Sequence, residues 1–548
     1  MAERLHAEGV EALFTLGGGH IVELLDGCAD AGVRVIGTRH EGSATLAAEG
    51  FALATGRPGV AAVTAGPGFT NCLTGFADAA LGSVPLVLIG GRTTQKRRGR
   101  GAVQDVDQVA MVDRLAKWTG VAYNLQSVQR LTSEALHRAV TDRPGAVYLE
   151  VPHDVFMARG EPAGLAWGFP TPLPRSTAAP SDLDRVVSAL RAASRPLVLA
   201  GGGAFWSGAA EELADFCTAW EIPLTTTSAA RGLVADSHPW CLGSLVHAGT
   251  AAVSADCVLI LGSAFNGNLV YGGPPLFTEE QTLIQVDAAA GELGGNRRAD
   301  LALRGDVREV LKQLRAAALE SSRDGRDWLA QGRELVGLSR EMWDRQVDDY
   351  AGPLVHPGAL AREVFGFARD TWGGAATLVA DGGDSLTWGL AYADAERPGR
   401  LLSTTTALGT LGVGMPFALG AKLARPEEPV VLLTGDGSFG LSAMELDTAV
   451  RNQLPVIVVV ANNAGWGDVR HHQREMYHRE VASQLADTRY DRLAEALGAR
   501  GERVETVAGI RPAMERAAAA GVASLIDVPT DPDVLSALLR AMMAVGIM

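Results

Sequence analysis

Short runs of apolar residues recur along the chain, and each one ends at a glycine or a polar residue before a helical stretch begins. The runs are "GVAAVTAGPG" (59–68), "VPLVLIGG" (84–91), "RPLVLAGGG" (195–203), "DCVLILGS" (256–263), "TLIQVD" (282–287), "VVLLTGDG" (430–437) and "LPVIVVVANN" (454–463). Nearly continuous Val, Leu and Ile runs of this length are typical of strands buried on both faces of a parallel sheet. Their alternation with helical stretches predicts an α/β protein of doubly wound parallel sheets.

Two stretches interrupt this alternation and divide the chain into three blocks. Residues 160–183 are rich in Pro, Gly and Ala, and residues 316–358 are charged and irregular in pattern, so we interpret both as linkers. A chain of 548 residues is too long for one core. We therefore predict three domains at about 1–155, 183–315 and 355–548. The third block resembles the first in pattern, without an obvious repeat in sequence.

Composition and charge narrow the class of protein. Hydrophobic residues make up 47% and charged residues 20%, which is typical of a packed soluble protein. A net charge of −15 argues against a nucleic-acid partner. The longest apolar run (454–461) has the length of a strand, and the five cysteines form no CxxC pair. We expect a cytoplasmic protein with reduced thiols and no membrane contact.

The strongest local motif, "TGDGSFGLSAMELDTAVRNQLPVIVVVANNAGWG", covers residues 434–467. Gly435, Asp436, Gly437 and Ser438 follow one predicted strand, and Asn463 follows the next, with a helix between. Parallel strands bring their carboxyl ends to the same sheet edge, where glycines and a helix N-terminus receive phosphate. Carboxylate and amide oxygens suit Mg²⁺. The simpler alternative is two ordinary turns.

This arrangement resembles the GDG…NN signature of thiamine-diphosphate enzymes of the acetolactate synthase-like superfamily, and the resemblance extends through the whole chain. It implies a first domain that binds the aminopyrimidine, a Rossmann-like central domain and a last domain that binds the diphosphate. The implied Mg²⁺ ligands are Asp436, Asn463 and the carbonyl of Gly465. The implied diphosphate contacts are Gly437, Ser438 and the segment "DGGDS" (381–385), with Gly382 and Asp384.

Glu41 opens "EGSATLAAEGFALAT", a run of small residues typical of a tightly packed helix. A carboxyl buried there needs a partner or retains a proton. The resemblance implies that Glu41 faces N1′ of the aminopyrimidine and enables the cofactor to lose its thiazolium C2 proton. It also implies that the carbonyl of Gly409 accepts a hydrogen bond from the 4′-amino group and that Leu411 bends the cofactor. The alternatives are a helix N-terminal Glu favoured by the macrodipole and an ordinary glycine-rich turn.

The resemblance further implies an assembly and a possible nucleotide. In the family the glutamate and the diphosphate site come from different subunits, so a homodimer is the expected minimum and a homotetramer is common. Some relatives hold ADP or FAD in the central domain. Here the stretch between Arg231 and Arg297 has no Lys or Arg, which removes obvious phosphate partners. "LAGGGAFWSGA" (199–209) does not meet the G-x-G-x-x-G spacing.

Three stretches bear on the substrate: "LGGGHIVELL" (16–25), "RGAVQDVDQVAM" (100–111) and "NNAGWGDVRHHQREMYH" (462–478). The pattern is similar to benzaldehyde lyase and 2-hydroxyacyl-CoA lyases. That likeness implies that His20 relays protons to the substrate and that Gln104 hydrogen-bonds the same oxygens; a purely structural His20 is the alternative. The polar residues after Asn463, from Asp468 to Glu475, are expected to form a lid over the substrate. The basic loop "QKRRGR" (95–100) favours a CoA substrate, or is a solvated surface.

We therefore predict a Mg²⁺- and thiamine-diphosphate-dependent carbon–carbon lyase or carboligase. Its expected substrate is a small carbonyl compound or an acyl-CoA, namely a 2-hydroxy ketone or a 2-hydroxyacyl-CoA thioester. The alternative enzyme is an acetolactate synthase-type decarboxylating ligase that acts on pyruvate. A catalytically silent scaffold is a further alternative, although a silent protein has no physical reason to retain Glu41, Asp436 and Asn463 together.

Overall fold

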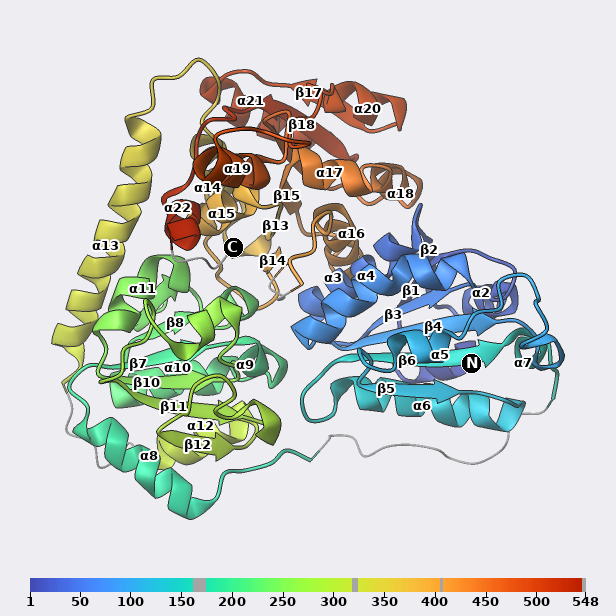
Figure 1. The fold of residues 1–548 in the computed structure, drawn as a ribbon, viewed down its shortest axis with the longest axis horizontal. Helices are drawn as coiled ribbons and strands as arrows, with labels where there is room; N and C mark the ends of the chain where they lie inside the picture. Colours follow the sequence, from blue (N-terminus) through green and yellow to red (C-terminus); the bar gives the residue numbers. More distant parts are fainter. Residues whose placement is uncertain (161–173, 318–323, 405–407, 545–548) are drawn as a thin grey trace.

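The computed structural model describes residues 1–160, 174–317, 324–404 and 408–544 (Figure 1). Parts of both predicted linkers, three residues of the stretch 404–424 and the last four residues lie outside this range. Each of the three domains contains one six-stranded parallel sheet covered by helices. The prediction of three doubly wound α/β domains is thus confirmed, whereas the exact domain boundaries stay predictions.

The first sheet has the strand order β2-β1-β3-β4-β6-β5. Its strands are β1 (Ala12–Leu16), β2 (Arg34–Gly37), β3 (Gly59–Val63), β4 (Leu86–Arg92), β5 (Trp118–Val121) and β6 (Ala146–Pro152). Its helices are α1 (Ala2–Ala7), α2 (Val22–Asp30), α3 (Glu41–Thr55), α4 (Pro67–Gly82), α5 (Gln108–Val112), α6 (Leu125–Val140) and α7 (His153–Phe156). The central strands β3 and β4 are buried along their whole length, which explains their continuous apolar runs.

The central sheet has the order β12-β11-β10-β7-β8-β9. Its strands are β7 (Pro196–Ala200), β8 (Leu224–Thr226), β9 (Cys241–Ser244), β10 (Cys257–Leu261), β11 (Thr282–Asp287) and β12 (Leu301–Arg304). Its helices are α8 (Pro180–Ala192), α9 (Gly202–Trp206), α10 (Ala210–Trp220), α11 (Leu245–Ser254) and α12 (Val307–Ala316). This is the strand order of dinucleotide-binding folds, with its switch point between β7 and β10.

The third sheet has the order β14-β13-β15-β16-β18-β17. Its strands are β13 (Thr377–Asp381), β14 (Leu401–Ser403), β15 (Val430–Gly435), β16 (Ile457–Asn462), β17 (Arg500–Arg503) and β18 (Ser524–Pro529). Its helices are α14 (Pro357–Trp372), α15 (Asp384–Tyr392), α16 (Gly414–Ala424), α17 (Asp436–Ser442), α18 (Glu445–Arg451), α19 (Gly467–Tyr477), α20 (Tyr490–Ala496), α21 (Val507–Ala519) and α22 (Ala537–Ala544). Counted from its first strand, this sheet has the same order as the first sheet.

Helices α3 and α16 join the first and third domains side by side (Figure 1). A Cβ placed on Gly50 would lie 2.5 Å from the Cα of Phe417, and one on Gly420 would collide with the carbonyl oxygen of Ala47. Only glycine permits such close backbones. The small residues of α3 therefore serve the contact between domains, in agreement with the tightly packed helix that the sequence predicts.

The stretch 316–358 is a correction to the predicted irregular linker. Most of it forms α13 (Arg326–Asp348), a helix of 23 residues that runs along one side of the molecule (Figure 1). Trp328, Leu329, Trp343 and Val347 are its buried apolar residues, and their helical spacing is obscured in the sequence by the many charges between them. Among the described residues, no helix combines the length and apolar character that crossing a membrane requires.

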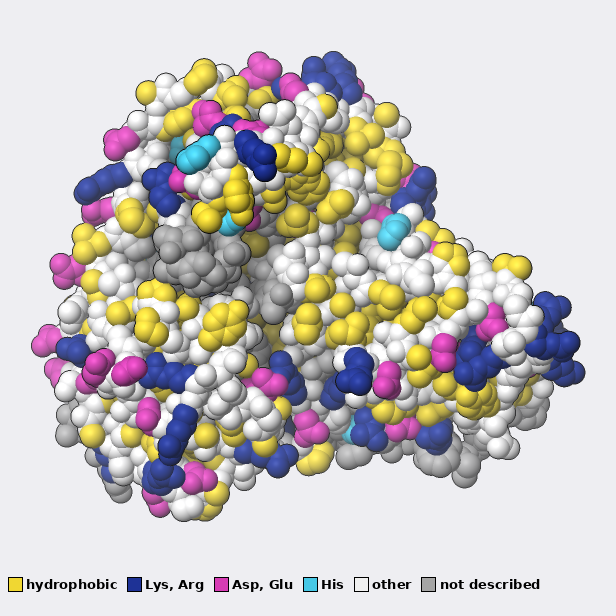
Figure 2. Space-filling view, viewed as in Figure 1, with side chains coloured by type: hydrophobic (Ala, Val, Ile, Leu, Met, Phe, Trp, Pro, Cys, Tyr) yellow, Lys and Arg dark blue, Asp and Glu magenta, His cyan; other side chains and the backbone are white. Residues whose placement is uncertain are grey.

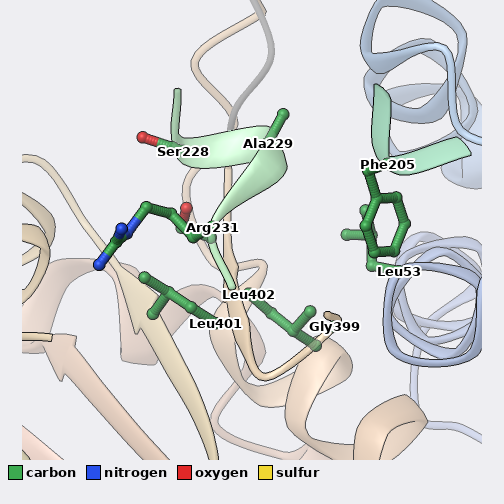
Figure 3. A pocket seen from close by; sticks show the side chains of 9 residues that line it. Leu53, Phe205, Ser228, Ala229, Arg231, Gly399, Leu401 and Leu402 are labelled. Atoms are coloured by element: carbon green, nitrogen blue, oxygen red, sulfur yellow. The ribbon is translucent and has the colours of Figure 1, made fainter. Parts of the chain in front are cut away.

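A small pocket lies where the three domains meet (Figure 3). Leu53 comes from the first domain, Phe205 from the central domain and Leu402 from the third. The guanidinium of Arg231 points away from the pocket and is paired with Asp236. None of the predicted site residues lines this pocket. The predicted site residues lie instead at the edges of the first and third sheets.

Candidate active site

Three adjacent strands of the third sheet end at the predicted metal and diphosphate residues. Asp381 ends β13 and pairs with Thr434 of β15, and Gly435 pairs with Ala461 of β16. Asp436 and Asn463 follow directly after β15 and β16. The structure thus brings the segments 381–385, 435–438 and 462–465 to one sheet edge, at the switch point between β13 and β15.

Asp436 is 2% exposed and lies at the first position of α17. Its Oδ2 accepts a hydrogen bond of 3.0 Å from the backbone N–H of Gly465. Burial raises the pKa of this carboxyl to about 6, and backbone N–H groups oppose the rise. A cation beside Asp436 would favour its charged form, so the carboxyl is suited to metal binding.

Asn463 presents the second oxygen of this edge. Its Oδ1 is buried and has no hydrogen-bond partner among the described residues. Buried polar atoms nearly always have a partner, so this oxygen has room for one that the chain itself does not supply. The loop is held from behind by Arg470, which donates to the carbonyl oxygen of Asn463 at 3.3 Å and to that of Ala464 at 2.9 Å.

The segment 381–385 approaches the turn after β15. A Cβ on Gly382 would lie 3.5 Å from Oγ of Ser438 and 3.4 Å from the backbone nitrogen of Gly435. Gly382 has a φ of +111°, which favours glycine. Ser385 Oγ donates to the carbonyl oxygen of Asp381 at 2.7 Å, and a Cβ on Gly435 would lie 3.1 Å from it. The two segments predicted to contact the diphosphate therefore lie side by side.

Asp384 begins α15, so its backbone N–H belongs to the free donors of a helix N-terminus. Its side chain is buried beside Asp468, and burial followed by that neighbouring carboxyl raises its pKa to about 7. A carboxylate would repel a diphosphate. We therefore expect the backbone of Asp384 to offer the contact, and its side chain to do so only when protonated.

The loop before α16 carries the two residues predicted to contact the cofactor's ring system. Gly409 has a φ of +66°, and Leu411 is half-buried. Thr410 between them donates from Oγ1 to Oδ1 of Asp78 in α4 at 2.7 Å. Asp78 thus fixes this loop against the first domain, a role that no motif in the sequence indicates.

Glu41 begins α3 and is 6% exposed. Its Oε2 accepts a hydrogen bond of 3.0 Å from Nδ2 of Asn71 in α4. No hydrogen bond reaches Oε1 among the described residues, and a Cβ on Gly68 would lie 3.4 Å from it. Glu41 is thus a buried carboxyl with one oxygen bonded to Asn71 and one oxygen available to a ligand. Its place at a helix N-terminus is also consistent with the macrodipole alternative.

His20 lies after β1, at the switch point between β1 and β3 of the first sheet. Its ring Nδ1 is 3.0 Å from Oγ1 of Thr64, which also accepts from the His20 backbone N–H at 3.3 Å. A Cβ on Gly18 would lie 2.5 Å from the Cβ of Thr64, so only glycine permits this approach. Burial, followed by the charge of His153, lowers the pKa of His20. The ring therefore favours its neutral form, which can accept a proton.

Gln104 folds back onto the turn after β3. Gln104 is half-buried and has a φ of +64°. A Cβ placed on Gly66 would lie 2.8 Å from the Cβ of Gln104. Gln108, which sequence reasoning missed, is fully buried behind it. Its Oε1 accepts from the N–H of Gly66 at 3.2 Å, and its Nε2 donates to the carbonyl oxygen of Gly91 at 3.1 Å. Gln108 thus fixes the turn on which Gln104 rests.

The predicted lid after Asn463 forms the single helix α19. Arg470 and His471 in it are buried at 4% and 5% exposure, so they support the metal loop and are not free to cover a substrate. Asp468 is half-buried, and a Cβ on Gly383 would lie 2.9 Å from its Cβ. The prediction of a lid is therefore wrong for Arg470 and His471, because the motif marks polarity but not burial.

The residues form two groups on two domains. Glu41, Asn71, His20, Thr64 and Gln104 belong to the first domain, and Asp436, Asn463 and the segment 381–385 to the third. Within the described residues, no hydrogen bond or ion pair joins these two groups. The domains do contact each other elsewhere, as where Glu445 accepts from the backbone N–H of Arg39 at 3.0 Å.

Comparison with known proteins identifies the class. Models described as the N-terminal TPP binding domain, the central domain and the C-terminal TPP binding domain of thiamine pyrophosphate enzymes match residues 1–111, 183–314 and 381–528. The chain therefore belongs to the thiamine pyrophosphate (thiamine diphosphate) enzyme family.

Relatives with different names cover nearly the whole chain. A probable acetolactate synthase of Mycobacterium bovis is 36% identical over 97% of this chain and 95% of its own length. The 2-hydroxyacyl-CoA lyase 2 of Homo sapiens is 33% identical over 91% of this chain and 84% of its own. The large subunit of acetolactate synthase isozyme 2 of Escherichia coli is 31% identical over 91% and 89%. This protein is thus an acetolactate synthase-like member of the family.

Proposed function

We propose that this protein is a thiamine-diphosphate- and Mg²⁺-dependent carbon–carbon lyase or carboligase. It cleaves 2-hydroxy ketones or 2-hydroxyacyl-CoA thioesters to aldehyde or ketone products, or forms them in the reverse direction. The observation that carries this proposal is the position of His20: a half-buried imidazole at the first-domain switch point, held through Nδ1 by Thr64. With no hydrogen bond to its Nε2 among the described residues, the ring can accept the proton of a substrate hydroxyl group.

The residues of the third domain fit the cofactor and its metal. Asp436 and the unpartnered Oδ1 of Asn463 are hard oxygen donors at a sheet edge, and the carbonyl of Gly465 is the proposed third ligand. Gly437, Ser438, Gly382 and the backbone of Asp384 would hold the diphosphate at the N-termini of α17 and α15. Gly409 and Leu411 would contact the rings. Thiamine diphosphate, when bound, supplies the nucleophile that attacks a carbonyl and receives the electron pair of the broken C–C bond.

The chain's own residues would supply the proton transfers. Glu41 would pass a proton through Oε1, the oxygen that no hydrogen bond reaches among the described residues. His20 would take the proton of the 2-hydroxyl group while the C–C bond breaks and would return it to the product. Gln104 would donate a hydrogen bond to the substrate oxygens and fix their orientation.

We propose a homodimer as the minimum active unit and a homotetramer as the expected assembly. The proposal rests on the division of the two residue groups between two domains without a hydrogen bond between them. ADP or FAD in the central domain stays a prediction of the family resemblance and is not part of this proposal. The turns after β7 and β10 pack on each other there, and Gly203 N–H donates to the carbonyl oxygen of Gly262 at 2.8 Å.

A second candidate is an acetolactate synthase-type ligase that starts from pyruvate. The identity of 36% to a probable acetolactate synthase favours it. Against it, the loop after β10, "LGSAFNGNLVYGG" (261–273), carries no arginine for a pyruvate carboxylate. A ligase of this kind would not require His20 as a base.

Product analysis separates the candidates. The purified protein with thiamine diphosphate and Mg²⁺ receives pyruvate in one reaction, an acyloin in a second and a 2-hydroxyacyl-CoA in a third. Aldehyde or ketone from the second or third reaction supports the lyase. Acetolactate and CO₂ from the first reaction alone would overturn it in favour of the ligase. If no reaction gives a product and the protein does not bind the cofactor, the alternative of a catalytically silent scaffold is supported.

A further inference from the structure

The loop that leaves β4 carries a cluster of free positive charges. Lys96, Arg97, Arg98 and Arg100 are all exposed. Among the described residues, none of these side chains forms a hydrogen bond or an ion pair. The charge of Arg98 reaches the buried Glu150 but does not pair with it. We refer to these four residues as the basic loop.

The backbone of the basic loop is fixed although its charged side chains are not. Gln95 donates from its backbone N–H to Oδ1 of Asp154 and from Nε2 to Oδ2 of Asp154, each at 3.2 Å. Gly99 N–H donates to Oδ2 of Asp105 at 2.6 Å. The two nearby carboxylates therefore hold the backbone and leave the cations uncompensated. A pre-ordered loop loses less entropy when it binds a ligand.

Such a cluster is unusual in this acidic chain. The net charge is −15, and many arginines elsewhere are paired with carboxylates, as Arg503 is with Asp487, Glu505 and Asp527. Figure 2 shows Lys and Arg side chains gathered at the end of the first domain near α7, against which Gln95 is bonded. A local positive field on a negative protein concentrates anionic ligands at that place.

The basic loop also leads directly into the proposed substrate site. Gln104 lies four positions after Arg100 in the chain, which limits the distance between their Cα atoms to about 14 Å. Gln104 rests on Gly66 in the turn that begins with Thr64, and Thr64 contacts His20. An anion bound by the basic loop is therefore beside the group that would contact the reacting carbonyl.

We infer that Lys96, Arg97, Arg98 and Arg100 bind the phosphate groups of a coenzyme A thioester, so that the substrate class is the 2-hydroxyacyl-CoA rather than the free 2-hydroxy ketone. This inference rests on the proposed lyase function. Several phosphates on one flexible arm match several free cations on one fixed loop, whereas an uncharged acyloin gains nothing from them. Arginine and lysine are the side chains that receive phosphate oxygens in proteins.

The test compares two thioesters of the same 2-hydroxy acid, one of coenzyme A and one of the short thiol N-acetylcysteamine. A variant with K96Q, R97Q, R98Q and R100Q is expected to raise KM for the coenzyme A thioester about tenfold or more, which is the sum of four modest exposed contacts. The value of kcat/KM for the short thioester is expected to stay unchanged. Added salt should weaken the coenzyme A reaction of the unmodified enzyme and not that of the variant.

The matched control neutralises four exposed arginines of the central domain and α13: R185Q, R298Q, R304Q and R345Q. It changes the net charge equally and should leave both substrates unaffected. An unchanged KM for the coenzyme A thioester in the basic-loop variant would overturn the inference, and so would an equal loss with both thioesters. Calorimetric titration with free coenzyme A and with inorganic phosphate distinguishes the nucleotide from phosphate alone.

The same titration separates this inference from the proposed function. If neither thioester is cleaved but coenzyme A binds the unmodified protein and not the basic-loop variant, the lyase proposal fails and the binding site stands. If both thioesters are cleaved with equal kcat/KM and coenzyme A does not bind, the lyase stands and the assignment of the basic loop is wrong.

Discussion

The first and third domains have the same sheet order, and each has functional residues at its switch point, but the two switch points differ in chemistry. At the third-domain edge the side chains are Asp436, Asn463 and Asp381, all oxygen donors in a buried setting. At the first-domain edge His20 is half-buried and Thr64 holds its ring. The same sheet order thus carries two different sites. The edge of the third domain is suited to a cation and an anion, and the edge of the first domain is suited to proton transfer.

The difference shows how little of the function lies in the fold. Both sheets place strand ends together, and the residues just after the strands decide what is bound there. At the switch point of the central domain the turns after β7 and β10 pack on each other, and Gly203 N–H donates to the carbonyl oxygen of Gly262 at 2.8 Å. Substitutions at each of the two sheet edges test this difference between the first and third domains.

The largest effect is expected for Asp436→Ala. Loss of the only carboxylate proposed as a metal ligand should weaken binding of Mg²⁺ and thiamine diphosphate together by at least about 100-fold and abolish turnover. Calorimetric titration of the cofactor with and without Mg²⁺ measures this. Glu427→Ala, which removes an exposed carboxylate of the same domain, is the control. Unchanged cofactor affinity would mean that the third-domain edge is not the cation site.

Glu41→Gln should reverse that pattern, with cofactor bound and chemistry lost. The amide is isosteric but cannot exchange a proton, so turnover should fall about 10²- to 10⁴-fold, the range of general acid–base groups. Exchange of deuterium into C2 of the bound cofactor should slow with it. Glu11→Gln, an exposed carboxylate of the first domain, serves as the control. Turnover near normal would remove the proton-holding role of Glu41.

His20→Ala should produce a smaller and more selective loss. Cleavage should slow about 100-fold, at the lower end of the range for a general base, while C2 exchange stays nearly intact. The two rates are measured on the same preparation, with the exposed His6→Ala as a control. An equal loss of both rates would place His20 in a structural role and end the contrast between the two edges.

The smallest effect concerns pH. Because burial and then the charge of His153 lower the pKa of His20, the acid limb of kcat/KM should lie below the usual pH 6.5 of histidine. A base works in its neutral form, above its pKa. His153→Gln removes a positive neighbour, so the pKa of His20 should rise and the limb should move to higher pH. The measurement is the pH profile of cleavage, and a limb that moves downward or stays in place contradicts it.

The sequence predicts much of the frame and part of the site. Alternating apolar runs and helical stretches give the α/β class, and the spacing of Asp436 and Asn463 indicates two neighbouring strand ends. Gln108 escapes prediction because a polar residue that bonds backbone groups has no spacing of its own. The sequence pattern places Arg470 and His471 in a lid because polar residues are mostly exposed. Their burial is not visible in the pattern, because it depends on contacts between residues far apart in the chain. Helix α13 is missed in the sequence because many charged residues lie between its few buried apolar residues.

The glycine contact between α3 and α16 has a consequence for dissecting this protein. Each helix presents an alanine- and glycine-rich face that packs against the other domain. A fragment that ends after the first domain would expose that face to water, where it would favour association with other copies. We therefore expect that neither the first nor the third domain stays soluble when it is produced alone. The two domains stabilise each other, although the central domain separates them in the chain.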